Sequence, residues 1–324
     1  MSEPDGNGPP LVFGPVPSRR LGRSIGINNI PPKVCSFACV YCQVGPTLDR
    51  LTDRRAFFLP EQVAAAVAAR VTEVRARGEE VDYVTFVPDG EPTLDAGLAT
   101  TLGLLRPLGV PRAVITNASL LWRDDVRAAL ADAEWVSVKV DAVIADLWKR
   151  VNRPDPSLDL ATVLDGIAAF SVEFTGDLVA ETMLVAGLND TPESLEAVGA
   201  FLRDVGIHRS YLSIPTRPTP YAGIGAPDED TVNRAYQTLA RWVPEVEYLV
   251  GYEGDAFSST GDARTDLLGI TAVHPMRASA VRDLVERSGA TWGVVDALVA
   301  EGLLTPTIYR DETYYVRRFS RQTA

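Results

Sequence analysis

The sequence predicts an α/β protein in which a partial (β/α)6 barrel precedes a small C-terminal domain. Six short β-branched apolar runs alternate with Ala- and Leu-rich segments of helical period, the order expected of parallel strands joined by helical crossovers. After residue 251 the chain becomes polar and glycine-rich, and then shows the order helix, turn, helix and hairpin. Six units are two short of a closed TIM barrel, so we expect a TIM-like partial barrel followed by a winged-helix-like domain.

The predicted elements follow from this alternation. Strands are expected at residues 24–28, 83–87, 113–117, 136–141, 178–185 and 211–215. Helices are expected at residues 60–77, 94–106, 123–131, 158–170, 192–205 and 229–242, the first with Pro60 in its first turn and Gly78 as its stop.

Four segments divide the chain in this interpretation. They are an N-terminal extension (1–23), the barrel (24–250), a linker (251–265) and the winged-helix-like domain (266–324). In the last segment we expect helices at 277–287 and 292–301 and a hairpin formed by 303–309 and 313–318. Residues 265–324 hold seven arginines and seven acidic residues, whereas a DNA-recognition module is usually basic. Docking against the barrel or a partner is therefore favoured over DNA binding.

Composition excludes several classes of protein. The 324 residues are 46% hydrophobic and 23% charged, which excludes a disordered chain. No apolar run approaches the roughly 20 residues of a membrane-spanning helix, and the polar start does not resemble a signal peptide, so we expect a cytoplasmic protein without a membrane partner. The net charge of −12 argues against nonspecific nucleic-acid binding and leaves a local basic site open.

All three cysteines lie within eight residues, at Cys35, Cys39 and Cys42, with the spacing C-x3-C-x2-C. A disulfide would leave one thiol unpaired, and a structural zinc site would need a fourth ligand, although His208 and His274 are far away in sequence. The remaining alternative is that the three cysteines are ordinary core residues with no functional role. Their clustering within eight residues disfavours this alternative. Three thiolates at one point favour an iron–sulfur cluster, since iron in such clusters prefers sulfur ligands.

This loop, with Tyr41 before the last cysteine, resembles the radical S-adenosylmethionine (radical SAM) superfamily. The resemblance implies one [4Fe-4S] cluster held by the three cysteines, with one iron open to the amino and carboxylate groups of S-adenosylmethionine. It also implies reductive cleavage to a 5′-deoxyadenosyl radical that abstracts hydrogen. Gly90 and Glu91, after the second predicted strand, resemble the family's Gly-Gly-Glu motif for the methionine amino group, with Asp89 in place of the first glycine.

Further residues at the ends of later strands are expected near the cofactor or substrate. Lys139 and Asp141 share one strand face; they either pair with each other or contact cofactor and substrate, and we take them as candidate catalytic residues. By resemblance, the candidate S-adenosylmethionine contacts besides Tyr41, Gly90 and Glu91 are Asn117, Glu181, Thr182, Leu184 and Pro215.

Nearly the whole chain resembles a narrower branch related to the wyosine-type tRNA synthases. The segments that carry this likeness are Gly-Pro-Val-Pro-Ser-Arg-Arg-Leu-Gly-Arg-Ser at 14–24, Asn-Arg-Pro at 152–154 and His-Pro-Met-Arg at 274–277. The resemblance implies that those synthases hold a second iron–sulfur cluster with additional cysteines. The three cysteines of this chain are all assigned to the first cluster, so none is left for a second one.

The substrate is expected at the open end of the barrel. Arginines expected there suit an anionic group unless they pair with nearby acids: Arg19, Arg20, Arg23, Arg50, Arg54, Arg55, Arg150, Arg153 and Arg217. We therefore expect a radical SAM enzyme that acts on a small-molecule or nucleotide-like substrate and takes electrons from an external donor such as flavodoxin or ferredoxin. The alternatives are a tRNA base-modifying enzyme of the same chemistry and a non-catalytic, redox-sensing DNA-binding protein.

Overall fold

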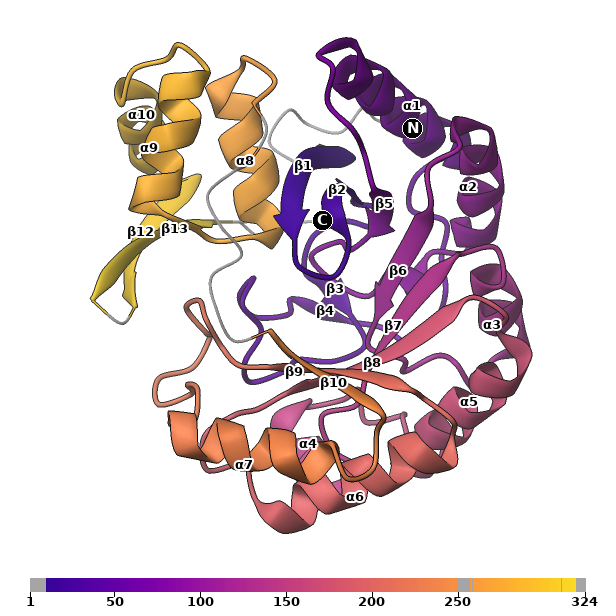
Figure 1. Ribbon diagram of the computed structural model, residues 1–324. Coiled ribbons are helices and arrows are strands. Elements are labelled where there is room, and N and C mark those ends of the chain that lie inside the picture. The colour runs from indigo at the N-terminus through magenta and orange to yellow at the C-terminus, as the bar shows by residue number, and fades with distance from the viewer. Residues whose placement is uncertain (1–9, 250–256, 258, 310, 319–324) are drawn as a thin grey trace.

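The main body is an eight-stranded sheet curled into a half-barrel, with helices on its convex side (Figure 1). The computed structural model describes residues 10–249, 257, 259–309 and 311–318. From β2 to β10 all neighbouring strands are parallel, whereas β1 and β2 form an antiparallel hairpin. The sheet order is β1 (Val12–Ser18), β2 (Gly22–Ile27), β5 (Tyr83–Phe86), β6 (Arg112–Thr116), β7 (Trp135–Lys139), β8 (Asp177–Met183), β9 (Arg209–Ser213) and β10 (Glu245–Leu249).

The helices bury one apolar face against the sheet. In the first of them, Val63, Val67, Val71 and Val74 are buried at helical spacing. Asp228 shows how local sequence sets a helix start, because its carboxylate accepts a hydrogen bond from the amide of Thr231 at 2.7 Å. The helices are α1 (Pro60–Ala76), α2 (Leu98–Leu105), α3 (Asp124–Leu130), α4 (Ala145–Val151), α5 (Leu160–Glu173), α6 (Pro192–Asp204) and α7 (Glu229–Leu239).

The α/β partial barrel is confirmed, with one further strand at each edge of the sheet. β1 falls in the segment predicted as an N-terminal extension; its Gly14, Pro15 and Pro17 are residues depleted in strands, which hid it from sequence reasoning. β10 is largely exposed and carries two glutamates, so it lacked the apolar run that marked the other strands.

The turn between β1 and β2 closes one end of the half-barrel. Leu21 in this turn packs in a buried cluster with side chains of β6, β7, β8, β9 and β10. Arg19 Nη1 also donates a hydrogen bond to the backbone oxygen of Tyr248 in β10, 3.4 Å away, so the turn spans the gap between the two edges of the sheet. This end of the interior is therefore filled, and the carboxyl ends of the parallel strands are left to build a site.

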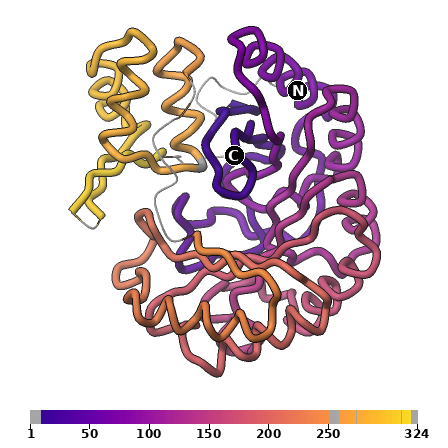
Figure 2. The backbone as a smooth tube through the Cα atoms, viewed as in Figure 1, coloured from indigo at the N-terminus to yellow at the C-terminus, as the bar shows by residue number. Residues whose placement is uncertain are grey.

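The C-terminal module stands beside β1, as the trace in Figure 2 shows. It has its own core, which includes Phe257, Leu267, Leu284 and Leu298. Residues 251–256 and 258 of the predicted linker lie outside the described residues. The first helix of the module begins at Ala263, inside the predicted linker, because Asp262 caps it. The elements are α8 (Ala263–Val273), β11 (Met276–Arg277), α9 (Ala278–Arg287), α10 (Gly293–Ala300), β12 (Leu304–Tyr309) and β13 (Glu312–Arg317), with the sheet order β11-β13-β12.

α8 lies against β1 and covers that edge of the large sheet. A Cβ at Gly269 of α8 would lie 2.9 Å from Cγ of Pro10, so the glycine permits the close approach. The element order of the module is compatible with a winged helix, and that class stays a prediction. Within the described residues, no helix is both long and apolar enough to cross a membrane.

Candidate functional site

The cysteine loop follows β2 at the carboxyl end of the sheet. Cys35 ends the short strand β3 (Val34–Cys35), which pairs with β4 (Asp49–Arg50), and Cys39 and Cys42 follow in the loop. None of the three forms a disulfide. Burial is the main cause that raises the pKa of each thiol, to about 12 for Cys39, and neighbouring thiols raise the pKa of Cys35 and Cys39 further. The amide of Cys42 donates to the backbone oxygen of Cys39 at 3.2 Å, so the second and third cysteines share one turn.

The three cysteine thiols suit an iron–sulfur cluster as a set of ligands. In the described part of the chain, no three His, Cys, Asp or Glu side chains converge so that they could hold one ion. A structural zinc site needs four ligands around one point, whereas the cysteines of a four-iron cluster each bind a different iron and surround the cluster.

The loop after α4 holds the cysteine loop in place. The amide of Ala38 donates to the backbone oxygen of Arg153 at 3.1 Å, and the amide of Val40 donates to that of Val151 at 2.9 Å. The side-chain amide of Asn152 lies 3.6 Å from Sγ of Cys39. The Asn-Arg-Pro segment singled out in the sequence is thus part of the scaffold around the cysteines.

Gly90 brings the end of β5 against the cysteine loop. It forms a parallel bridge with Val34, and a Cβ at position 90 would lie only 1.9 Å from the backbone oxygen of Val34. Glycine is therefore required here for close approach of two backbones. The contact brings the predicted Gly90–Glu91 turn and the first cysteine into one site.

Glu91 is buried, with 1% of its surface exposed. Its Oε1 accepts hydrogen bonds from the amide and hydroxyl of Thr93, at 3.0 and 2.5 Å, and from the hydroxyl of Thr116, at 2.6 Å. Its Oε2 accepts one, from the amide of Asn117 at 2.7 Å. Burial raises the pKa of Glu91, and these hydrogen bonds offset part of the rise. Oε2 therefore accepts one hydrogen bond from the described residues, whereas Oε1 accepts three.

Asp89, which stands where the family motif has a glycine, is paired with a lysine that the sequence gave no reason to choose. Lys33 Nζ lies 2.6 Å from Oδ2 of Asp89, and both side chains are buried. Burial raises the pKa of Asp89 to about 6, although the charge of Lys33 counteracts it. Both charges act on the Cys42 thiol, so this ion pair lies beside the third cysteine.

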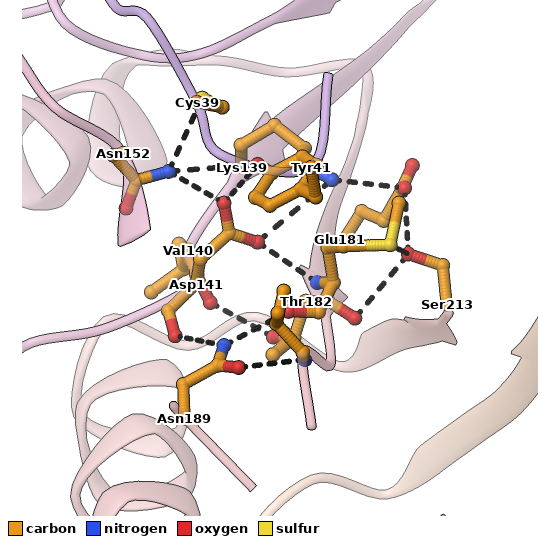
Figure 3. A network of polar contacts seen from close by, with 12 residues as sticks. Cys39, Tyr41, Lys139, Val140, Asp141, Asn152, Glu181, Thr182, Asn189 and Ser213 are labelled. Carbon is orange, nitrogen blue, oxygen red and sulfur yellow. Dashed lines mark hydrogen bonds and ion pairs between the residues drawn. The ribbon is translucent and has the colours of Figure 1, made fainter. Parts of the chain in front are cut away.

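Asp141 is the centre of a buried polar network (Figure 3). Its carboxylate accepts hydrogen bonds from the Tyr41 hydroxyl, from Nδ2 of Asn152 at 2.6 Å and from the amide of Met183 at 2.8 Å. Because Asn152 also approaches Cys39, the network connects the end of β7 with the cysteine loop. Tyr41 is thus positioned by Asp141, 100 residues along the chain.

Lys139 and Glu181 extend this network across β7 and β8. Lys139 Nζ is 3.0 Å from Oε1 of Glu181 and 3.8 Å from Oδ1 of Asp141. Burial alone would lower the pKa of Lys139, but the two carboxylates outweigh it and raise the pKa. Burial alone would raise the pKa of Glu181, but Lys139 and Arg20 lower it to about 2. Lys139 therefore pairs with both acids, more closely with Glu181.

The remaining predicted cofactor residues divide into two groups. Asn117 lies beside the first cysteine, with Nδ2 at 3.5 Å from Sγ of Cys35. By contrast, the Thr182 hydroxyl donates to the backbone oxygen of Val140 at 2.8 Å, and Leu184 packs in the main core. These two side chains contact the protein itself, and their role as cofactor contacts stays a prediction. Pro215 follows β9, and its backbone oxygen accepts a hydrogen bond from the Tyr309 hydroxyl at 2.9 Å.

Several of the arginines expected at the open end lie elsewhere or serve the fold. Arg19, Arg20 and Arg23 belong to the β1–β2 turn and the start of β2, at the opposite end of the strands, although Arg20 extends to Glu181. Arg54 binds the Asp125 carboxylate at 2.8 Å and backbone oxygens nearby. The expectation that these arginines together line the mouth is therefore not met.

Sequence reasoning missed Lys33, Asn152, Asn189 and Ser213, which hold the site together. Asn189 Nδ2 donates to the backbone oxygens of Asp141 and Met183, both at 2.8 Å, and the Ser213 hydroxyl donates to Glu181 at 2.9 Å. Lys33 directly precedes β3 and Ser213 ends β9, whereas Asn152 follows α4 and Asn189 lies in the turn after β8. The Asn-Arg-Pro motif was the signal in the sequence for Asn152.

A half-barrel with a three-cysteine loop at the carboxyl end of its strands defines a class of iron–sulfur protein. The family model of the Radical SAM superfamily matches residues 29–202. A UPF0026 protein of Methanocaldococcus jannaschii is 38% identical over 309 residues, covering 95% of this chain and 96% of that protein. The chain belongs to the Radical SAM superfamily and, within it, to the UPF0026 proteins.

Two solved structures share the fold. A radical SAM methyltransferase from Sphaerobacter thermophilus superposes with a TM-score of 0.53 at 19% identity, covering 70% of this chain and 66% of the other. A structure of TYW1 with a lysine-pyruvate adduct bound superposes with a TM-score of 0.52 at 16% identity, covering 68% and 74%. At these identities the likeness concerns the fold.

Proposed function

We propose that this protein is an enzyme that uses one [4Fe-4S] cluster, held by Cys35, Cys39 and Cys42, to cleave S-adenosylmethionine and abstract hydrogen from a substrate. The observation that carries the proposal is the pairing of Val34 with Gly90, which brings the cysteine loop and the Glu91 carboxylate together. When bound, the cluster supplies the single electron that cleaves the sulfonium bond and yields a 5′-deoxyadenosyl radical.

Glu91 is the residue we assign to the methionine amino group. In the described part of the chain no lysine or arginine forms an ion pair with it, and burial together with neutral donors sets its pKa. A buried carboxylate without a cationic partner is unfavourable, so a ligand ammonium group at Oε2 would supply the missing charge. Asn117, Tyr41 and Pro215 remain proposed cofactor contacts on the grounds of their positions around the cysteine loop.

In this proposal Lys139 and Asp141 form an ion pair that lies beside the cofactor and keeps its position and charge. Because the pKa of Lys139 is raised, its amine is protonated at neutral pH and serves as a hydrogen-bond donor, not as a base or nucleophile. Two cations, Arg20 and Lys139, face two carboxylates, Glu181 and Asp141, so the network carries no surplus positive charge. This balance favours a substrate recognised by hydrogen bonds over one held by its negative charge alone.

Neither alternative is favoured by a specific contact. For tRNA modification, Cys35, Cys39 and Cys42 leave no further cysteine for the second cluster that the resemblance to the wyosine-type synthases implies. For DNA reading, α10 would be the helix to enter the groove, yet it has no basic residue and exposes Asp296, with Glu301 directly after it. We therefore propose a small-molecule or nucleotide-like substrate and an external electron donor such as flavodoxin or ferredoxin.

The test is anaerobic reconstitution with iron and sulfide, then incubation with S-adenosylmethionine and dithionite and assay for 5′-deoxyadenosine. We expect four irons per chain and slow formation of 5′-deoxyadenosine in the wild-type protein. The control is Cys39→Ala, which should lose the cluster and all product. Full iron content in that variant, or no cleavage by the loaded wild-type protein, would contradict the proposal.

A further inference from the structure

The segment after β9 is held between two parts of the chain that are far apart in sequence. On one side, Oε1 of Gln43, the residue after Cys42, accepts hydrogen bonds from the amide and hydroxyl of Thr216, at 3.1 and 3.3 Å. On the other side, the hydroxyl groups of Tyr309 and Tyr314 donate to the backbone oxygens of Pro215 and Thr216, at 2.9 and 3.2 Å. Residues 215–216 thus connect the cysteine loop with the C-terminal hairpin formed by β12 and β13.

The same segment is joined to the polar network at its start. Ser213, the last residue of β9, donates its hydroxyl proton to Oε1 of Glu181 at 2.9 Å. Its backbone oxygen also accepts a hydrogen bond from the amide of Leu184 at 2.8 Å. In the part of the chain that the structure describes, the strand pairing of β9 ends at Ser213. Beyond it, the contacts from Gln43 and the two tyrosines restrain residues 215–216.

The C-terminal contacts are preorganised. Tyr314 is buried, with 1% of its surface exposed, and Nε of Arg277 donates to its hydroxyl oxygen at 3.0 Å, which leaves the hydroxyl proton for Thr216. Next to it, Nη2 of Arg217 lies 3.0 Å from Nε2 of His274. Burial and then the charge of Arg217 lower the pKa of His274, so the ring is neutral and its nitrogen can accept this hydrogen bond.

We propose that the hairpin of β12 and β13 is a positioning element of the S-adenosylmethionine site, and that Tyr309 and Tyr314 are its positioning residues. They fix the backbone of residues 215–216 and, through Gln43, the segment that carries Cys42. The inference rests on the proposed function, because it takes Pro215 as a cofactor contact. It gives the C-terminal module a role inside the enzyme without any nucleic-acid partner.

The first test is hydrogen exchange of the full chain with its cluster reconstituted. In the variant Tyr309→Phe/Tyr314→Phe, the amide of Thr216 should exchange about tenfold faster, because two hydrogen bonds that restrain its segment are lost. Tyr248→Phe is the matched control, since it removes a tyrosine hydroxyl on β10 whose partner is Asn233. Unchanged exchange at Thr216 in the double variant would overturn the inference.

The second test is the affinity for S-adenosylmethionine, measured by the change it causes in the electron paramagnetic resonance signal of the reduced cluster. Tyr314→Phe and Gln43→Met should each weaken binding about fivefold at unchanged iron content. Combined, they should weaken binding by less than the product of the two factors, because both act on Thr216. Gln43→Glu keeps the acceptor oxygen and should restore most of the affinity.

The outcomes separate this inference from the proposed function. If the loaded wild-type protein does not bind S-adenosylmethionine, the proposed function fails and the inference fails with it. If the wild-type protein binds and the tyrosine variants bind equally well with the same melting temperature, the inference alone is overturned. Equal melting temperatures and iron contents with weaker binding support positioning and exclude a merely structural role.

Discussion

Two buried glutamates at the carboxyl end of the same sheet behave in opposite ways. Glu91 is surrounded by neutral donors, and burial raises its pKa; Glu181 is paired with Lys139 and Arg20, which lower its pKa to about 2. Burial is the first cause in both, so the difference lies in the partners. Glu181 has its cations within the protein and is built into the fold, whereas Glu91 has no cationic partner among the described residues and is suited to a cationic ligand.

The largest expected effect on stability comes from removing the charge of the ion-paired glutamate, Glu181. Glu181→Gln removes the carboxylate between two partly buried cations, Arg20 and Lys139, and should lower the free energy of unfolding by about 3 kcal/mol at pH 7. The measurement is urea denaturation of the metal-free protein under anaerobic conditions. A loss below ~1 kcal/mol would show that the network contributes little to the fold.

The pH dependence of stability should differ in sign between the two sites. The pKa of Glu181 lies below its ordinary value of 4.5, so its stabilising contribution is complete above that pH and is lost as pH falls toward about 2. The pKa of Glu91 is raised, so its ionisation costs stability as pH rises above 4.5. Between pH 3 and 7, the stability of wild type relative to Glu181→Gln should rise, and relative to Glu91→Gln should fall; slopes of equal sign would contradict the comparison.

For S-adenosylmethionine binding, unlike stability, we expect the substitution of Glu91 to have a larger effect than that of Glu181. Glu91→Gln should weaken S-adenosylmethionine binding at least about tenfold, because an ammonium group loses its charged acceptor, while the free energy of unfolding falls by only about 1 kcal/mol. The measurement is titration of the reconstituted protein, with iron content as the control. Unchanged affinity would remove Glu91 from the cofactor site.

Thr116→Val sharpens the distinction between the two oxygens of Glu91 and has the smallest expected effect. It deletes one donor to Oε1 and leaves Oε2 unchanged, so we expect about 1 kcal/mol of destabilisation and affinity within about twofold of wild type. A large loss of affinity at unchanged stability would show instead that the ligand depends on Oε1.

Local patterns in the sequence predicted the half-barrel, the cysteine loop and the Gly90–Glu91 turn, because spacing and strand ends determine them. Which side chains pair with one another in the site could not be predicted from such local patterns. Arg20 meets Glu181 across 161 positions and Asn152 approaches Cys39 across 113, so only the curled sheet brings these side chains together. The same holds for β1, whose prolines conceal a strand that α8 covers.

The most direct test of the central claim compares the electron paramagnetic resonance spectra of reduced, reconstituted wild-type protein and Glu91→Gln with and without S-adenosylmethionine. We expect a four-iron signal in both proteins that shifts on addition of S-adenosylmethionine in wild type and shifts only at much higher concentration in the variant. A wild-type signal that does not respond to S-adenosylmethionine, with no 5′-deoxyadenosine formed, would contradict it.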